Sequence, residues 1–217
     1  LAGLIVDLAG DDPNNIITTL TPLLYYALTV IVGLTFMVFI FYPLIIYFKT
    51  GVTIKKFLKA IFPAQMLAFS TSSSAATLPL TMKRVEKNLN VSDEVTSFVC
   101  PLGATINMDG TSIHQAISAV FIAQAFGQDL TLIDQVAIVL TATLSSIGAA
   151  AVPGAGLIML VIVLGAIGID PQGLALIIAI DRPLDMLRTV VNVTGDATVA
   201  SVVASTEGEK IKYTEDE

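Results

Sequence analysis

Charged residues are scarce in this sequence. Asp, Glu, Lys and Arg make up 13% of its 217 residues, against 54% hydrophobic residues, whereas soluble domains carry about 25% charged residues. Residues 16–48 and 136–169 contain no charge at all. Runs of roughly 18 or more apolar residues are typical of membrane segments, and buried helices of soluble proteins rarely stay uncharged for so long. The sequence therefore predicts an integral membrane protein, rather than a protein with a large soluble core.

Cysteines and nucleic-acid-binding patterns are also missing. The single cysteine, Cys100, excludes an internal disulfide and a multi-cysteine metal site. No basic patch with interleaved aromatic residues favours nucleic acid as a partner. The chain starts at Leu1, within an apolar stretch and without a basic signal-peptide region. We therefore expect it to be a fragment of a longer protein.

Polar loops divide the chain into apolar segments. Asp, Pro, Asn and Gly mark several of these loops, as in "GDDPNN" and "DPQG", because these residues favour turns. The expected order is a helix end with an outer loop (1–12), a long transmembrane helix (13–49), an inner hairpin (53–89), a broken transmembrane helix (92–127), an outer hairpin (131–169), a last transmembrane helix (171–205) and a tail (206–217), which we expect to be loose.

The two hairpins are predicted from charges and lengths. Basic residues flank the serine-rich segment 60–82 on both sides, and short basic loops stay cytoplasmic. A single crossing would place one basic cluster outside, so this segment should enter and leave at the inner face. Residues 136–169 have acidic flanks, and a straight helix of that length would measure about 50 Å against a hydrocarbon core of about 30 Å. This segment should form a second hairpin, from the outer face.

Two such hairpins form an inverted repeat, which is typical of secondary transporters with a site near the midplane. The predicted fold class is an all-α integral membrane protein, with transmembrane helices, two oppositely oriented re-entrant helical hairpins and broken helices. The hairpin tips, "STSSSAATLPLT" and "AAAVPGAG", would offer hydroxyl and backbone groups to a polar ligand. Non-helical backbone at membrane depth is tolerated only when it is buried in protein or lines a wet cavity.

The last segment carries a polar stripe. Asp181, Asp185, Arg188, Asn192 and Asp196 fall within roughly 80° of one helix face. Charged groups in a membrane helix are costly and usually functional; the alternative is a set of ion pairs that stabilise the helix. Three acids and one base leave an excess of negative charge, which a bound cation would balance.

The chemistry of this stripe suits a zwitterion. Arg188 offers a planar fork for a carboxylate, and Asp185, one turn earlier, could hold an ammonium group. Together they would bind an amino acid with an acidic side chain, with Thr189 and Asn192 adding neutral hydrogen bonds. Asp196 lies deeper in the segment and suits a hard cation that prefers oxygen ligands.

The stretch "NMDGT" interrupts an apolar segment and should free backbone carbonyls at membrane depth. With Asn107 and Asp109, these carbonyls could form a cation site, and Met108 could contribute its sulfur. The alternative is a kinked helix in which Asp109 pairs with Arg182 or Arg188. His114, the only histidine, is either a proton relay or a satisfied core residue.

These motifs resemble the glutamate/aspartate transporters of the dicarboxylate/amino acid:cation symporter family. The matching stretches are "SSSAATLP", "NMDGT", "AAVPGAG" and "DMLRTVVNVTGD", in this order, and the likeness covers residues 16–207. The resemblance implies sodium-coupled symport of aspartate or glutamate by an elevator mechanism, and no enzyme activity. A transport domain would slide across the membrane against a fixed scaffold, with the outer hairpin as gate.

The family's N-terminal part, with its trimerisation scaffold, does not occur in this chain. Residues 1–12 would include the end of a scaffold-type helix, residues 13–205 would be the transport domain of a homotrimer, and residues 206–217 would be a cytoplasmic tail. The resemblance places the protein in the cell membrane (inner or plasma membrane) as a multi-pass protein with a cytoplasmic C-terminus, and such a fragment should give no vectorial transport by itself.

The resemblance also assigns roles to residues. Arg188 would bind the substrate's side-chain carboxylate, Asp185 its amino group, and Asp181 would orient Arg188. The further substrate contacts would be Ser72, Ser74, Thr111, Val152, Gly156, Thr189 and Asn192. Sodium would be transported together with the substrate, at three sites. The first site would consist of the carbonyls of Gly103, Asn107 and Asn192 with the carboxylate of Asp196. The second would consist of the carbonyls of Thr105, Ser146, Ile147 and Ala149 near Met108, and the third of Asn107 with Asp109.

Other functions stay open. Arg188 disfavours the neutral amino acid exchangers of the family, Asp185 its dicarboxylate branch, and Asp196 its proton-coupled members. Members usually carry a second arginine where this chain has Ser72 and Met186, which leaves the preference for aspartate or glutamate and potassium counter-transport undecided. Outside the family, the alternatives are a cation channel module or an intramembrane hydrolase with a serine nucleophile in the inner tip, although no general base lies nearby.

Overall fold

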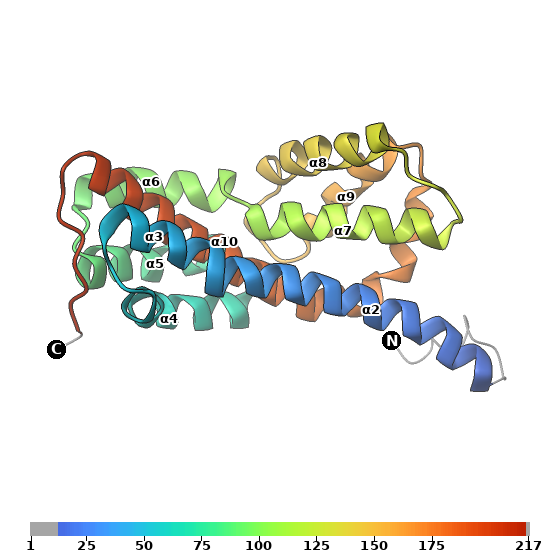
Figure 1. The fold of residues 1–217 in the computed structure, drawn as a ribbon, viewed down its shortest axis with the longest axis horizontal. Helices are drawn as coiled ribbons and strands as arrows, with labels where there is room; N and C mark the ends of the chain where they lie inside the picture. Colours follow the sequence, from blue (N-terminus) through green and yellow to red (C-terminus); the bar gives the residue numbers. More distant parts are fainter. Residues whose placement is uncertain (1–12, 216–217) are drawn as a thin grey trace.

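Residues 13–215 are described by a computed structural model, in which every regular element of this range is a helix (Figure 1). The prediction of an all-α chain is confirmed. The helix end and loop predicted for residues 1–12 lie outside the described residues.

The first helical unit is a long rod. It consists of α2 (Pro13–Phe36), a π-helical turn η1 (Met37–Phe41) and α3 (Tyr42–Thr50). Pro43 follows the π-helical turn; it has no backbone N–H to donate to the preceding turn, which locally favours a wider hydrogen-bonding pattern. The part from Leu20 to Thr50 is apolar and long enough to cross a membrane. The rod ends at Gly51, in the left-handed conformation typical of helix C-termini.

Two helical hairpins follow the same pattern. The first joins α4 (Ile54–Thr71) to α5 (Ser74–Leu89), and the second joins α8 (Leu132–Ile147) to α9 (Ala155–Ala166). In each hairpin the two helices pack against one another. The first tip turns through Ser72, which has a φ of 51°, and the second through Gly154, which has a φ of 78°. Ser72 is the C-cap of α4 and Gly154 is the N-cap of α9, so each left-handed residue lies at a helix end where the chain turns.

A helix with a break follows each hairpin. After the first hairpin, α6 (Asp93–Ile106) and α7 (Asp109–Ala125) are separated by Asn107 and Met108. After the second, a 3₁₀ turn, η2 (Pro171–Leu176), leads into α10 (Ile178–Thr206). The helix α10 runs through the middle of the molecule and packs against α2 to α7 and α9 (Figure 1).

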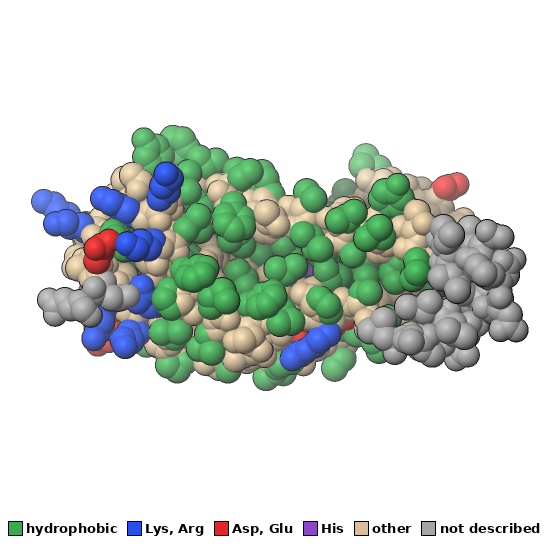
Figure 2. All heavy atoms as spheres, turned by 90° about the horizontal axis from the view of Figure 1, so that it is seen from below, with side chains coloured by type: hydrophobic (Ala, Val, Ile, Leu, Met, Phe, Trp, Pro, Cys, Tyr) green, Lys and Arg blue, Asp and Glu red, His purple; other side chains and the backbone are tan. Residues whose placement is uncertain are grey.

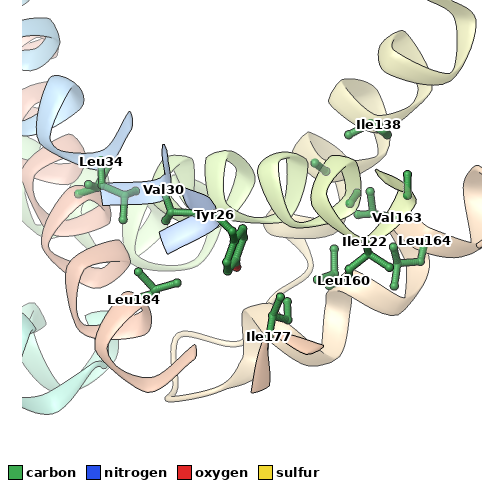
Figure 3. Close-up of a cluster of buried hydrophobic side chains, with 14 of the residues drawn as sticks. Tyr26, Val30, Leu34, Ile122, Ile138, Leu160, Val163, Leu164, Ile177 and Leu184 are labelled. Carbon is green, nitrogen blue, oxygen red and sulfur yellow. The ribbon is translucent and has the colours of Figure 1, made fainter. Parts of the chain in front are cut away.

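Two hydrophobic clusters hold the ends of the molecule. One joins α2, α7, α8 and α9 to the start of α10, with Tyr26 and Leu184 among its members (Figure 3). The other joins α3 to α6 with the later part of α10, around Phe57 and Ala200. The space-filling view shows hydrophobic side chains over the middle of the surface, and Lys and Arg side chains gathered at the end that holds the C-terminus (Figure 2).

The C-terminal tail is attached, contrary to the expectation of a loose tail. The backbone N–H groups of Lys212 and Thr214 donate to the carbonyls of Leu89 and Asn88, at 3.1 and 3.0 Å. Ile211 is buried in the second hydrophobic cluster. The tail therefore has an apolar contact and backbone partners, which the polar composition of this segment does not reveal.

Candidate functional site

The polar stripe of α10 is buried between the two hydrophobic clusters. The relative exposures are 6% for Asp181, 7% for Asp185, 1% for Arg188, 4% for Asn192 and 1% for Asp196. Burying so many charges is costly unless they are paired or bind ligands. This is the stripe that the sequence spacing predicts, and around it gather the break between α6 and α7 and both hairpin tips.

Arg188 lies at the centre of the stripe. Its Nη2 donates to Oδ1 of Asp185 at 2.6 Å and lies 3.3 Å from Oδ1 of Asp181. Its Nη1 lies 2.7 Å from Nδ1 of His114. The Nε group is buried and has no hydrogen-bond partner. The ion pairs considered from sequence therefore form, but they leave the Nε donor of the guanidinium unused.

The outer hairpin tip closes over this arginine. The N–H of Gly154 donates to Oδ2 of Asp185 at 2.9 Å. A Cβ on Gly156 would lie 3.1 Å from Nη1 of Arg188 and 2.9 Å from Cγ2 of Thr111, so the backbone can approach so closely only with glycine here. Thr111 and Gly156, both predicted substrate contacts, thus lie together beside Arg188.

Gln115 holds both arms of the outer hairpin. Its Nε2 donates to the carbonyl of Gly156 on α9 at 3.0 Å, and its Oε1 accepts a hydrogen bond from the hydroxyl of Ser145 on α8 at 2.7 Å. Gln115 is fully buried. One amide on α7 therefore fixes the tip relative to the broken helix.

The two hairpin tips touch. The hydroxyl of Ser73 donates to the carbonyl of Ala151 at 2.7 Å, and the N–H of Ala75 donates to the same carbonyl at 3.4 Å. Ser72, predicted to contact substrate, is 2% exposed, and its hydroxyl has no hydrogen-bond partner. The N-terminus of α5 thus contacts the outer tip a few residues before α9 begins, and helix N-termini attract anions. Of the other tip residues predicted to contact substrate, Ser74 is 3% and Val152 53% exposed.

The first predicted sodium-ligand set is brought together. Nδ2 of Asn107 donates to Oδ1 of Asp196 at 3.0 Å and lies 3.5 Å from the carbonyl of Asn192. A Cβ on Gly103 would lie 2.5 Å from Oδ1 of Asp196, so the carboxylate rests directly on the α6 backbone. Among the described residues, Asp196 accepts a hydrogen bond from the neutral amide of Asn107 and none from a basic side chain.

The Asn192 side chain connects the stripe to the break. Its Oδ1 accepts from the N–H of Gly110 at 2.8 Å, and its Nδ2 lies 3.2 Å from Sδ of Met108 and 3.4 Å from Oγ1 of Thr111. Thr189, one helical turn earlier, is 4% exposed and donates its hydroxyl to the carbonyl of Asp185 at 2.9 Å.

The second predicted set is only partly assembled around α7. The Ser146 hydroxyl lies 2.6 Å from that of Ser112, and the Ser146 carbonyl accepts from the N–H of Ala149 at 3.0 Å. Ile147 is 43% exposed. Thr105 is exposed and bonds within its own helix, with its hydroxyl 2.9 Å from the carbonyl of Leu102.

In the third set, Asp109 does not pair with an arginine. Its Oδ2 accepts a hydrogen bond from the hydroxyl of Tyr42 at 2.5 Å, while Arg182 and Arg188 contact Asp185. The described residues contain no group of three or more His, Cys, Asp or Glu side chains that would hold a metal ion. Cation binding here would therefore rest on single carboxylates with amide and backbone oxygens.

Sequence reasoning missed several of these contacts. The sequence predicts no role for Gln115 and Tyr42. It predicts Ser73 only as one of the inner-tip serines that could be a hydrolase nucleophile, and His114 only as a proton relay or a core residue. A neutral polar residue in an apolar helix, such as Gln115, is a usable signal. Tyr42 gives no such signal, because tyrosine is a common residue near the ends of membrane helices.

A buried, charged site enclosed by two helical hairpins, among largely apolar helices, is typical of membrane transporters. The model of the sodium:dicarboxylate symporter family matches residues 1–206. The chain is 45% identical over 190 residues to an excitatory amino acid transporter of Caenorhabditis elegans, covering 88% of this chain and 38% of that protein. It is 46% identical over 178 residues to human excitatory amino acid transporter 2, covering 82% and 31%. It is 41% identical over 204 residues to human excitatory amino acid transporter 5, covering 94% and 36%.

The chain belongs to the sodium:dicarboxylate symporter family, as its motifs predicted. It spans about a third of the length of these curated relatives. The family consists of membrane transporters rather than enzymes.

Proposed function

We propose that the full-length protein is a sodium-coupled symporter of acidic amino acids. The observation that carries this proposal is the position of Arg188, a buried guanidinium that lies beside two carboxylates and against the N-terminus of α9, under an outer hairpin tip that the inner tip contacts. A guanidinium and helix N-termini both favour a bound carboxylate. Asp185, bonded to Arg188, supplies the opposite charge that an amino group needs.

Substrate binding would rearrange the contacts of Arg188. The side-chain carboxylate of the substrate would accept hydrogen bonds from the unused Nε donor and one Nη group of Arg188. The substrate's amino group would then bind Asp185 in place of Arg188. Asp181 would keep the guanidinium in orientation. The remaining substrate contacts would come from Ser72, Ser74, Thr111, Val152, Gly156, Thr189 and Asn192.

The balance of charges in the stripe supports coupling to sodium. Asp181, Asp185 and Asp196 carry three negative charges in the stripe, and Arg188 carries one positive charge. A zwitterionic substrate with an acidic side chain adds another negative charge. Bound sodium ions, held by Asp196 and Asp109 with neighbouring amide and backbone oxygens, would offset this excess, so substrate and cation would bind together.

We further propose a re-entrant arrangement and an elevator mechanism. The hairpins α4–α5 and α8–α9 would enter the membrane from opposite faces and move with α10 as a transport domain, against scaffold segments that also form a homotrimer. The exposed lysines at the end that holds the C-terminus (Figure 2) favour a cytoplasmic position for that end, in a multi-pass protein of the cell membrane.

The test is uptake into proteoliposomes that contain the full-length protein. Labelled aspartate should accumulate under an inward sodium gradient and stay at background when potassium or choline replaces sodium. Excess unlabelled glutamate should compete, whereas succinate, which lacks an amino group for Asp185, should compete poorly. Equal uptake in choline would contradict sodium coupling, and succinate competing as well as aspartate would show a dicarboxylate carrier instead.

A further inference from the structure

His114 contacts the guanidinium at the centre of the site. It lies on α7 just beyond the break, is fully buried, and places Nδ1 2.7 Å from Nη1 of Arg188. Its other ring nitrogen, Nε2, lies 2.9 Å from the hydroxyl of Tyr26 on α2 and 3.4 Å from that of Ser118. The imidazole thus links the binding arginine to a second helix.

The contact with Arg188 determines the state of the imidazole. A guanidinium has only donors, so Nδ1 of His114 must accept and cannot carry a proton. In the neutral ring the proton is then on Nε2, which donates to Tyr26. The Tyr26 hydroxyl in turn lies 2.8 Å from that of Ser118 and can donate to it. Each hydrogen bond in this series, from Arg188 to Ser118, then has one donor and one acceptor.

The surrounding charges act on the guanidinium from one side. On α10, Asp181 and Asp185 lie on the Nη2 side of Arg188, and Oδ1 of Asp181 is 3.6 Å from Nε2 of His114. From α9, the Gly156 backbone covers Nη1. From α2, the neutral Tyr26 completes the surroundings. His114 is therefore the side chain that fixes Nη1, while the carboxylates fix Nη2.

We propose that His114 is a positioning residue that sets the selectivity for anionic substrates, because its neutral Nδ1 fixes the Nη1 edge of Arg188 beneath the hairpin tip. This inference rests on the proposed function. An acceptor at Nδ1 keeps the guanidinium directed at the substrate carboxylate. A donor at that point would repel it.

A matched pair of amide variants tests the position of the acceptor. In His114→Asn the amide oxygen can take the place of Nδ1, whereas in His114→Gln the amide reaches the place of Nε2. Sodium-dependent binding of labelled aspartate to the purified full-length protein, with unlabelled aspartate and asparagine as competitors, gives the selectivity for the anionic substrate. H114Q should reduce this selectivity about tenfold to a hundredfold, as expected for a lost hydrogen bond to a charged group. H114N should keep it within about threefold of wild type.

Equal selectivity in H114Q and wild type, or equal loss in both variants, would overturn the proposal, because packing alone does not distinguish the two amides. If H114Q does not fold, the double variant Y26F/S118A provides the second test. It removes the two hydroxyl partners of Nε2, so the imidazole is no longer held with Nδ1 facing Arg188, and it should also lower the selectivity; unchanged selectivity would overturn the proposal. Absence of sodium-dependent aspartate binding by the wild type would instead contradict the proposed function.

Discussion

At the scale of single residues, Asp196 is the clearest case of a charge that needs a partner. It is 1% exposed, and the one hydrogen bond it accepts in the described structure comes from a neutral amide, Asn107. A buried carboxylate without a counter-charge is costly. We therefore expect the protein without sodium to be destabilised at this point, and sodium to restore the stability.

Asp196→Asn should remove both effects. The variant keeps the size of the side chain but not its charge, so thermal stability in sodium-free buffer should equal or exceed that of the wild type. The stabilisation gained on adding sodium should shrink, with the half-saturating sodium concentration rising about tenfold or more. Thermal unfolding of the purified full-length protein over a sodium series measures both quantities.

The control for this variant is Asp129→Asn, on an exposed loop residue, which should leave the sodium response unchanged. A wild-type sodium response in D196N would remove Asp196 from the cation ligands.

The sequence could predict the polar stripe but not its partners. The stripe lies within one helix, so the spacing of Asp181 to Asp196 decides which side chains share a face. The contacts of Arg188 with His114 and of Asp109 with Tyr42 join residues 74 and 67 positions apart. Such contacts depend on how the helices pack against one another, and the spacing of residues within one helix does not predict this packing.

At the scale of elements, the inner hairpin tip depends on Ser73. Its hydroxyl accepts from the N–H of Ala76 at 3.1 Å, as the N-cap of α5, and donates to the carbonyl of Ala151 at 2.7 Å. One side chain therefore both starts a helix and fastens the two tips together.

Ser73→Ala should lower the free energy of unfolding by about 1–2 kcal/mol, through the lost cap and the lost tip contact. Since the tips enclose Arg188, aspartate should also dissociate several-fold faster, about what a loss of 1 kcal/mol gives. Thermal unfolding and the release rate of labelled aspartate from the full-length protein measure these changes.

Ser70→Ala is the matched control, because the exposed Ser70 hydroxyl contacts only carbonyls of its own helix, Met66 and Leu67. If S73A and S70A release aspartate at the same rate, the tip contact does not hold the site closed.

Local chemistry explains why the elements could be predicted better than the contacts. The serine tip, "NMDGT" and "AAVPGAG" contain residues that stop helices, and the structure has helix ends at each of them. The π-helical turn before Pro43 was not predicted. A proline inside an apolar helix can cause a kink or a changed hydrogen-bonding pattern. Which of these forms depends on the packing of the neighbouring helices.

At the scale of the whole molecule, α10 joins two hydrophobic clusters, one along its first half and one along its second half. Each cluster is formed by segments that are far apart in the sequence. The C-terminal tail likewise contacts segments that are distant in the sequence. The polar composition of residues 206–217 favours a loose tail. Composition does not show that Ile211 packs into an apolar cluster or that Glu209 binds the N-terminus of a helix. The carboxylate of Glu209 accepts from the N–H and the hydroxyl of Ser92, at 2.9 and 2.6 Å, at the N-terminus of α6.

Two of the contacts that hold the tail involve charged side chains, Glu209 with Ser92 and Lys59 with Glu215, and they should differ in strength. Glu209 combines two charge-assisted hydrogen bonds with a favourable helix dipole. Lys59 and Glu215 form an ion pair at 2.6 Å whose side chains are 65% and 71% exposed, and water screens such pairs. The lysine lowers the pKa of Glu215 below its ordinary value, so this pair is intact at neutral pH and is lost only as the pH falls through that lowered pKa.

Glu209→Ala should therefore release the tail, whereas Lys59→Ala should not. Lys210 and Lys212 are trypsin sites within the tail, and the backbone of Lys212 is held by Leu89. Cleavage there requires the tail to open, and a loss of about 1–2 kcal/mol raises the open fraction about fivefold to thirtyfold. Mass spectrometry of the full-length protein during limited trypsin digestion measures the rate. Cleavage of E209A at the wild-type rate would mean that Ile211 and the backbone bonds to α5 hold the tail without the carboxylate.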